Sequence, residues 1–228
     1  RDFKRVHGKD WSRLSDYVTI QLNDTHPVLA IPELMRQLVD EENINFDEAL
    51  AICKRIFNYT NHTIMAEALE SWPVDLVRSV IPNVYAMIEL LNNALIKEVS
   101  SLGMEQEQYR LQIINDGTVY MARMAIFMSR VVNGVARLHT EILKRNALNE
   151  WYRLYPDRFQ NKTNGVTQRR WLALCNRELT GLLKEKLGSD AFITNLQALR
   201  KLLPLAEDED TIRQFMAVKQ QKKEQLAA

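Results

Sequence analysis

The sequence predicts an α/β fold that is mostly helical and that forms part of a doubly wound domain. Strand-like segments are few, segments with helical periodicity are many, and polar runs directly follow apolar or β-prone segments. The polar runs are QLNDTHP (21–27), NYTNHT (58–63) and NKTNG (161–165). The few strands would form only a small sheet. We therefore expect the other strands of the domain to lie elsewhere in a longer chain.

Two strands and two helices are expected in the first quarter of the chain. Residues 17–22 (YVTIQL) are β-branched and aromatic, which is typical of a strand. Pro27 then breaks the chain, and Pro32 suits the first turn of a helix. A second helix is expected from about Asp47, and it leads into a short strand at residues 56–60.

A long amphipathic helix is expected after Pro82, packed as a layer over the sheet. Its apolar residues recur at helical spacing and are Val84, Ile88, Leu91, Leu95 and Val99. The polar residues 100–118 are expected to form a loop or a helical excursion. Residues 119–128 fit both a buried strand and a helix, and we favour the helix.

One more strand and three more helices are expected in the rest of the chain. Asn133 is expected to cap a helix whose apolar residues are Val135, Leu138 and Ile142. Residues 159–163 predict the last strand, and the helix after it is expected to end at Gly188. The tail 211–228 predicts a charged helix with a thin apolar face, which usually docks on another surface.

Composition excludes several classes of partner. The 228 residues are 46% hydrophobic and carry 30 basic and 29 acidic residues, so the net charge of +1 attracts neither nucleic acid nor an anionic membrane. Cys53 and Cys175 are far apart and outside any Cys/His cluster, so we expect reduced core thiols, no metal site and a cytoplasmic protein. The chain opens on Arg1, which we interpret as a piece of a longer protein.

The three polar runs predict a site for a neutral, polyhydroxylated ligand. Ligands of open α/β sheets bind beyond the carboxyl ends of the strands. Amide and hydroxyl side chains both donate and accept hydrogen bonds, as sugar hydroxyls require. The alternative is that Asn, Asp and Thr only make turns and helix caps there.

The chain resembles the α-glucan phosphorylases, the glycogen, starch and maltodextrin phosphorylase family. The matching runs are IQLNDTHPVLAIPELMRQL (20–38), YTNHTIMAEALESWPVDL (59–76), VVNGVARLHTEIL (131–143) and FQNKTNGVTQRRWLALCN (159–176). This resemblance implies a glycosyltransferase (GT-B) fold of two Rossmann-like domains that face a cleft. It implies that residues 1–205 are the later part of the first, glucan-binding domain and that 206–228 are a helix leading toward the second.

The resemblance also implies an activity and a cofactor for the full-length parent. Such enzymes transfer a terminal α-1,4-linked glucosyl unit from glycogen or maltodextrin to inorganic phosphate, which gives glucose 1-phosphate. They use pyridoxal phosphate, held on a lysine of the second domain. The family runs GTxNMK and KRxHEYKRQ, which carry that lysine and the phosphate-binding residues, are absent from this sequence. We therefore expect no cofactor-binding residue here, an inactive fragment, and a parent that is a homodimer.

Site residues follow from the resemblance by position. His62 resembles the catalytic residue whose backbone carbonyl faces the glucosyl ring and stabilises an oxocarbenium-like state. Asn164 resembles the asparagine whose amide binds the 6-hydroxyl group, and Val135 lines the same pocket. The residues expected beside the anomeric centre and in the gate loop are Asp24, His26, Glu67 and Glu70, with weaker claims for Thr25 and Thr63.

Departures from the family pattern concern rigidity and regulation. Ala66 and Gln168 each replace a usual proline, which implies a less stiff gate loop and a less rigid turn. Arg130 replaces a usual histidine. Regulated animal members bind an activating nucleotide through two adjacent arginines, but here the pair is Arg1-Asp2. We therefore expect an unregulated parent of bacterial type, because an acid repels phosphate.

Two alternatives stay open at this point, one from the same broad chemistry and one from a different class. A glycoside hydrolase needs two carboxylates about 5 to 10 Å apart, and Asp24, Glu67 and Glu70 are the candidates. A non-catalytic helical module would use an apolar face such as that of residues 84–99, but the three polar runs count against it.

Overall fold

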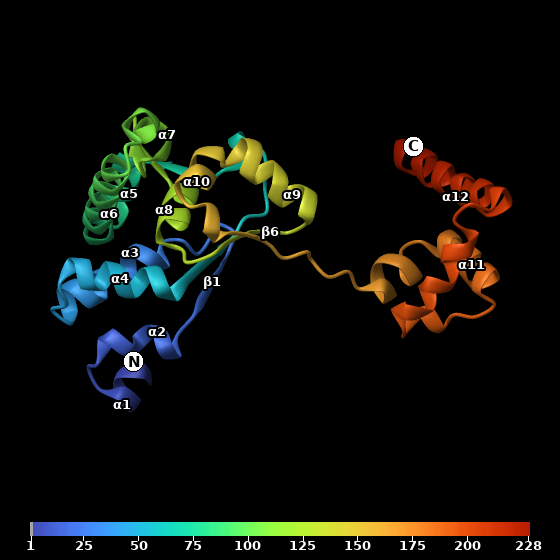
Figure 1. The fold of residues 1–228 in the computed structure, drawn as a ribbon, viewed down its shortest axis with the longest axis horizontal. Helices are drawn as coiled ribbons and strands as arrows, with labels where there is room; N and C mark the ends of the chain where they lie inside the picture. Colours follow the sequence, from blue (N-terminus) through green and yellow to red (C-terminus); the bar gives the residue numbers. More distant parts are fainter. Residues whose placement is uncertain (1) are drawn as a thin grey trace. The chain divides into compact units, whose positions relative to one another are not determined.

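The computed structural model describes residues 2–228, and it divides into two compact units (Figure 1). The first unit ends at Asn164, and the second covers Gly165–Ala228. The first unit carries a four-stranded and a three-stranded sheet, and the second is built from helices. The domain assignment of 1–205 and 206–228 refers to a longer protein, and it stays a prediction.

Helices dominate both units. In chain order the α-helices are α1 (Asp2–His7), α2 (Leu14–Tyr17), α3 (Ala30–Arg36), α4 (Phe46–Ile56), α5 (Val74–Val80), α6 (Pro82–Ser101), α7 (Gln108–Leu111), α8 (Met121–Met128), α9 (Arg137–Ile142), α10 (Asn149–Leu154), α11 (Arg177–Leu187) and α12 (Glu209–Ala227). The 3-10 segments are η1 (Trp11–Arg13), η3 (Ala66–Ala68), η4 (Glu105–Glu107), η6 (Pro156–Arg158), η8 (Ala191–Ile193) and η9 (Leu196–Leu205). The π-helical segments are η2 (Gln37–Glu41), η5 (Leu143–Ala147) and η7 (Arg169–Leu174).

The larger sheet is parallel throughout. Its strands are β1 (Ile20–Asn23), β2 (Phe57–Thr60), β6 (Val132–Gly134) and β7 (Phe159–Asn161), in the spatial order β1-β2-β6-β7. Strand order therefore equals chain order. Crossovers that all step in one direction and share one hand place their helices on one face of the sheet, and α4 and α8, from successive crossovers, do contact each other.

The register separates an apolar row from a polar row. Leu22, Tyr59, Val132 and Phe159 are lateral neighbours, and all four are buried. One residue further along each strand, the neighbours are Asn23, Thr60, Asn133 and Gln160. Because side chains alternate between the faces of a sheet, the two rows lie on opposite faces. The helices thus cover the apolar face, while Asn23 and Gln160 on the polar face are exposed.

The α/β, mostly helical part of the fold prediction is confirmed. Helix α6 covers the expected apolar stripe, and Ile88, Leu91, Leu95 and Val99 are fully buried. A doubly wound sheet needs a point where strand order reverses, and the strands of residues 2–228 show no reversal. That finer part of the prediction remains a proposal.

The prediction for Asn133 as a helix cap is wrong. Asn133 is the central residue of β6, and α9 begins at Arg137, after Ala136. The Asn133 side chain accepts a hydrogen bond from Thr60 Oγ1 (2.8 Å) on the neighbouring strand. Leu138, expected on the buried face of the helix, is 73% exposed. Pairing with β2 and β7 therefore overrides the local preference of asparagine for a cap.

The helical excursion expected within residues 100–118 is confirmed in part by η4 and α7, but the segment then continues into a hairpin that was not expected. Strands β4 (Ile114–Asn115) and β5 (Thr118–Tyr120) pair antiparallel, and β3 (Ser71–Pro73) pairs with the other edge of β5. The two residues of the turn, Asp116 and Gly117, both have positive φ (47° and 69°). This is the turn chemistry that Asp-Gly favours. The favoured helix for residues 119–128 is confirmed, because α8 follows β5 directly.

Smaller corrections concern the first strand and the thiols. Tyr17 ends α2 and the strand starts at Ile20, so the expected strand begins too early. Cys53 is fully buried, and burial raises the pKa of its thiol to about 12. Cys175 is exposed, so the expectation of a core thiol is wrong there. Among residues 2–228, no helix is both long and apolar enough to cross a membrane.

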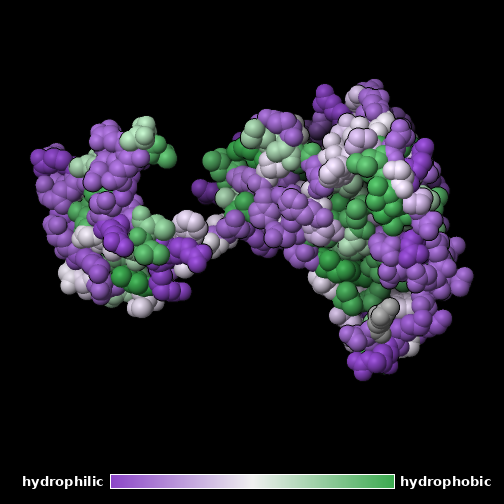
Figure 2. Space-filling model, turned by 180° about the vertical axis from the view of Figure 1, so that it is seen from behind, coloured by the Kyte–Doolittle hydropathy of each residue, from purple (hydrophilic) through white to green (hydrophobic). Residues whose placement is uncertain are grey.

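The second unit is a small helical assembly. Helix α11 is capped by Asn176 and ends at Gly188 (φ 67°), as expected. Helix α12 packs on α11, with an ion pair of 2.6 Å between Lys222 and Glu178. Its apolar face meets leucines of α11 and η9 around a groove of about 410 Å³. On the face shown in Figure 2, hydrophobic residues reach the surface as patches between hydrophilic ones.

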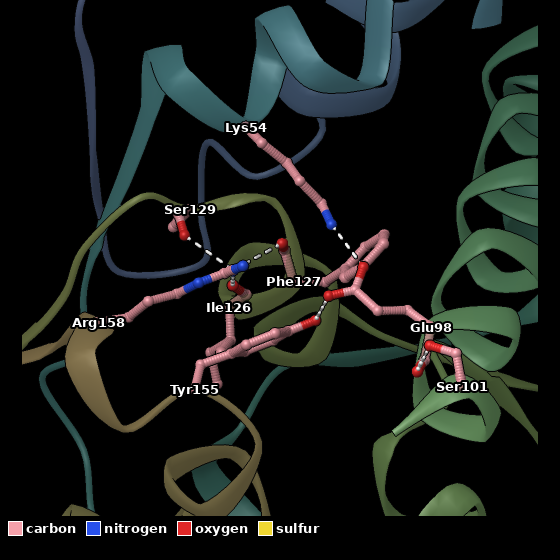
Figure 3. A network of polar contacts seen from close by, with 8 residues as sticks. All are labelled: Lys54, Glu98, Ser101, Ile126, Phe127, Ser129, Tyr155 and Arg158. Carbon is pink, nitrogen blue, oxygen red and sulfur yellow. Dashed lines mark hydrogen bonds and ion pairs between the residues drawn. The ribbon is translucent and has the colours of Figure 1, made fainter. Parts of the chain in front are cut away.

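A network of charged and hydroxyl groups ties the helical layer to the sheet (Figure 3). Glu98 of α6 accepts hydrogen bonds from Lys54 Nζ of α4 and from Tyr155 Oη, both at 2.8 Å. Arg158 donates to the carbonyl oxygens of Ile126, Phe127 and Ser129, at the end of α8. The Lys54 ammonium also lies 4.0 Å from the centre of the Phe127 ring. The network fixes the chain immediately before β6 and β7.

Candidate functional site at the strand ends

The expected site residues follow four neighbouring parallel strands. Asp24 and His26 follow β1, His62 and Thr63 follow β2, and Val135 and Asn164 follow β6 and β7. Because the strands are parallel and adjacent, their carboxyl ends lie at one edge of the sheet. The structure therefore brings these six residues to a common edge. His26, His62 and Asn164 are exposed there, and Asp24, Thr63 and Val135 are half-buried.

The chain turns sharply at the end of β1. Asp24 adopts a left-handed conformation (φ 65°), and its amide donates to the Thr60 carbonyl of the next strand (2.9 Å). Its carboxylate accepts from the Thr25 amide (2.7 Å), a short-range bond that aspartate favours in turns. On the same strand end, Asn23 Oδ1 lies 2.6 Å from His62 Nε2. The His62 imidazole is thus held by the side chain of Asn23, and the backbone carbonyl of His62 takes no part in this contact.

The segment after β2 is held by a fully buried asparagine. The Asn61 amide donates to the Asn133 carbonyl of β6 (3.0 Å), and Asn61 Oδ1 accepts from the Thr63 amide (3.0 Å). Its side-chain amide group also donates to Tyr59 Oη (3.1 Å). These bonds bracket His62 on both sides, so its peptide groups have a defined orientation.

Glu70 anchors the expected gate loop, the segment between β2 and β3. Its carboxylate accepts hydrogen bonds from the buried Thr25 hydroxyl (2.6 Å) and from Trp72 Nε1 (2.8 Å). Glu67 lies in the first turn of η3, whereas Glu70 directly precedes β3. Both glutamates line a cavity of about 370 Å³. A carboxylate with two donors already in place is a poor candidate for the free acid of a glycoside hydrolase.

The segments after β6 and β7 run together. The Lys162 amide donates to the Gly134 carbonyl (3.1 Å), and the Asn164 amide donates to the Val135 carbonyl (2.9 Å). The backbone of Asn164 is therefore fixed against Val135, while its side chain is exposed. This arrangement presents the Asn164 amide group at the strand edge, beside Val135.

Replacing Gly134 with alanine is expected to lower the free energy of unfolding by about 1–3 kcal/mol, as overpacking does. A β-carbon there would lie 2.9 Å from His139 Nδ1 and 2.9 Å from the backbone Cα of Thr140, and it would clash with Thr140 Oγ1. Backbone cannot give way cheaply at such distances. Urea unfolding measures the change.

Gly181→Ala is the matched control, because a β-carbon at Gly181 in α11 meets no atom within 4 Å. Alanine should stabilise a helix at that position by about 0.5–1 kcal/mol. A Gly134 variant as stable as the unchanged protein would contradict the close approach at the end of β6.

Sequence reasoning missed several residues that hold this edge. Asn23 and Asn61 belong to the polar runs, and the runs are the only signal that could have selected them. His139 contacts the Val135 amide and the Thr63 carbonyl, but it lies on a helix that was interpreted by its apolar spacing alone.

Three departures from the family pattern have different outcomes. Gln168 donates a side-chain hydrogen bond to the Ile193 carbonyl (3.0 Å), which supplies a restraint that the usual proline would supply covalently. The side chain of Ala66 and all of Arg1 lie outside what the structure describes. The expectations for a less stiff gate loop and for absent nucleotide activation therefore stay predictions.

Comparison with known proteins assigns the family. The carbohydrate phosphorylase family model matches residues 1–228. The chain belongs to the carbohydrate phosphorylase family. It is 45% identical over 218 residues to the brain form of human glycogen phosphorylase and 46% identical to the human muscle form. Each alignment covers 93% of this chain but 26% of the relative, so the chain spans about a quarter of these phosphorylases.

Proposed function

We propose that this chain is the sugar-binding segment of an α-1,4-glucan phosphorylase. The full-length protein would transfer a terminal glucosyl unit from glycogen or maltodextrin to inorganic phosphate, which gives glucose 1-phosphate. The observation that carries the proposal is the convergence of His62, Val135 and Asn164 at one edge of a parallel sheet, in a chain of the carbohydrate phosphorylase family. Neutral amide and carbonyl groups at such an edge suit sugar hydroxyls.

Each site residue has a proposed role. The His62 carbonyl stabilises positive charge that develops on the glucosyl ring, and the Asn164 amide binds a sugar hydroxyl. Val135 and Thr63 line the same pocket. Asp24 and His26 of the strand edge, together with Glu67 and Glu70 of the segment between β2 and β3, line the space beside the reacting bond. Glu70 contributes by holding the gate loop in place through its hydrogen bonds to Thr25 and Trp72.

Pyridoxal phosphate would be held outside this chain. The family's cofactor run GTxNMK is absent from the sequence. Lys54, a half-buried lysine of the helical layer, is engaged by Glu98 at 2.8 Å and is not free to form a Schiff base. Because the cofactor run is absent from the sequence, we propose no cofactor-binding residue in this chain.

The larger architecture is part of the same proposal. Parallel sheets are normally covered on both faces, whereas the polar row of this sheet includes the exposed Asn23 and Gln160. This supports a segment of a larger Rossmann-like domain within a GT-B enzyme. In that reading residues 1–205 belong to the first domain, 206–228 lead to the second, and the full-length enzyme is a homodimer.

The test of the proposed function is phosphorolysis by the full-length protein. Maltoheptaose and inorganic phosphate should yield glucose 1-phosphate, measured by a coupled assay. Release of free glucose or maltose without phosphate dependence would favour a hydrolase and would overturn the proposal.

The purified 228-residue chain by itself is expected to release no glucose 1-phosphate and to bind no pyridoxal phosphate. The reason is the absence of the cofactor and phosphate-binding runs. The measurements are the same coupled assay and the absorbance of the cofactor after borohydride reduction. Phosphorolysis by the chain alone, or a cofactor fixed to one of its lysines, would contradict this expectation.

A further inference from the structure

We propose that His139 is a positioning residue of the sugar site. Its imidazole lies between the backbone segment that carries His62 and the backbone segment that carries Val135, and it holds the two at a fixed separation. The geometric part of this inference is independent of the reaction, and the consequence for catalysis rests on the proposed function.

Two contacts define the bridge. The Val135 amide donates a hydrogen bond to His139 Nδ1 (3.1 Å), and His139 Nε2 lies 3.5 Å from the Thr63 carbonyl oxygen. An amide N–H can only donate, so Nδ1 must be the accepting nitrogen. The proton of the neutral ring is then on Nε2, where it points to a carbonyl, which can only accept. Both contacts are satisfied by one tautomer, the neutral Nε2–H form.

The fold makes room for this ring at the end of β6. A β-carbon on Gly134 would lie 2.9 Å from His139 Nδ1, so glycine is needed for the ring to approach the strand. His139 is half-buried, and its neighbour Thr140 is 2% exposed. The ring is therefore packed in place by the chain that it bridges.

The next residue extends the bridge to the fourth strand. Thr140 Oγ1 lies 3.1 Å from Asn161 Oδ1, at the end of β7, and 2.9 Å from the Ala136 carbonyl. Asn161 in turn donates to Thr163 Oγ1 (3.1 Å), next to Asn164. Two consecutive residues of α9 thus contact the segments after β2, β6 and β7, which carry the three residues proposed to meet the sugar.

The consequence for catalysis lies in the peptide next to His62. The proposed role of His62 uses its backbone carbonyl, and His139 contacts the carbonyl of the following residue, Thr63. A displacement of about 1 Å in a positioned group can lower a rate by about 100-fold. Loss of the bridge should therefore lower kcat more than it raises the KM for glucan, because the charge that the carbonyl stabilises develops only in the transition state.

Three variants of the full-length enzyme separate the two contacts. His139→Asn keeps an oxygen near the Nδ1 position and so retains the bond from Val135. His139→Gln can place an amide donor near the Nε2 position and so retains the contact to Thr63. His139→Ala loses both. We expect kcat to fall by about 10- to 100-fold in the alanine variant, less in the glutamine variant, with KM changed by less than about threefold.

Leu138→Ala is the matched control, because Leu138 is 73% exposed on the same turn of α9. It should keep the kcat of the unchanged enzyme. Equal kcat values in the alanine variant and the unchanged enzyme would overturn the positioning role. So would equal losses in the glutamine and alanine variants, because a merely structural defect is not rescued by the retained contact.

The tautomer provides a readout that needs no activity. Nitrogen-15 spectra of the 228-residue chain, labelled at histidine and assigned with His139→Gln, should show His139 as the neutral Nε2–H tautomer at pH 7.5. An Nδ1–H tautomer or an imidazolium would overturn the bridge. If the full-length enzyme lacks phosphorolysis altogether, the proposed function fails while this spectrum still decides the geometry.

Discussion

Glu98→Gln is expected to lower the free energy of unfolding by about 2–4 kcal/mol, because it leaves the Lys54 ammonium without a counter-charge in a largely buried position. The side chains of Lys54 and Glu98 are 21% and 31% exposed, and Glu98 also accepts a hydrogen bond from Tyr155 (Figure 3). Glutamine has the shape of glutamate, so the change removes charge and leaves packing nearly intact. Urea unfolding of the purified protein measures the effect.

The pH dependence of stability gives a second readout of the same pair. Burial acts to raise the pKa of Glu98, but the hydrogen bond and charge of Lys54, together with Tyr155 and Arg158, outweigh it and hold the pKa below its usual value of 4.5. A carboxyl with a lowered folded pKa contributes stability above its unfolded pKa and loses it as the pH falls through the folded value. The unchanged protein should therefore lose this contribution below about pH 4.5, and the variant should lack it at every pH.

The matched control is Glu89→Gln on the same helix. Glu89 forms a pair of 3.9 Å with Arg78, and both side chains are about half exposed. Exposed pairs contribute about 0–1 kcal/mol, so this variant should be nearly as stable as the unchanged protein. Equal losses in the two variants would show that burial of the Lys54 pair has no energetic consequence.

Asn164→Ala in the full-length enzyme is expected to lower kcat/KM by about 10- to 100-fold, which corresponds to about 1–3 kcal/mol of transition-state binding. The physical reason is a sugar hydroxyl left without its partner in the bound state. The backbone anchor of Asn164 is its amide, which donates to the Val135 carbonyl at 2.9 Å, and alanine keeps that bond. The loss should therefore report the side chain and not a displaced segment.

Steady-state phosphorolysis of maltoheptaose measures this change, with Asn83→Ala as the control. Asn83 is an exposed asparagine at the start of α6, away from the strand ends. An Asn164 variant with unchanged kcat/KM would show that the family role does not carry over to this position. Unfolding curves of both variants should coincide with that of the unchanged enzyme.

The features that the sequence by itself determined are those set by interactions between residues close together in the chain. The polar runs after β1, β2 and β7, the stripe of α6 and the end of α11 at Gly188 were all predicted correctly. Each depends on residues a few positions apart, such as helical periodicity or the left-handed conformation that glycine adopts without strain. The family assignment also came from the sequence, because long ordered runs carry it.

Only the tertiary structure decided how distant segments meet. Asn133 has the local preference of a helix cap, yet it pairs with Thr60, 73 residues away, because strand β6 adds to the edge of β2. By sequence Glu70 was a candidate for a free carboxylate, but in the structure it accepts hydrogen bonds from the Thr25 hydroxyl and from Trp72 Nε1. In the sequence His139 is only a polar residue on a short helix. In the structure the absence of a β-carbon at Gly134 lets the His139 ring contact Val135 and Thr63. Such roles depend on partners that periodicity cannot reveal, since sheet register and the packing of α9 bring them together only in the folded chain.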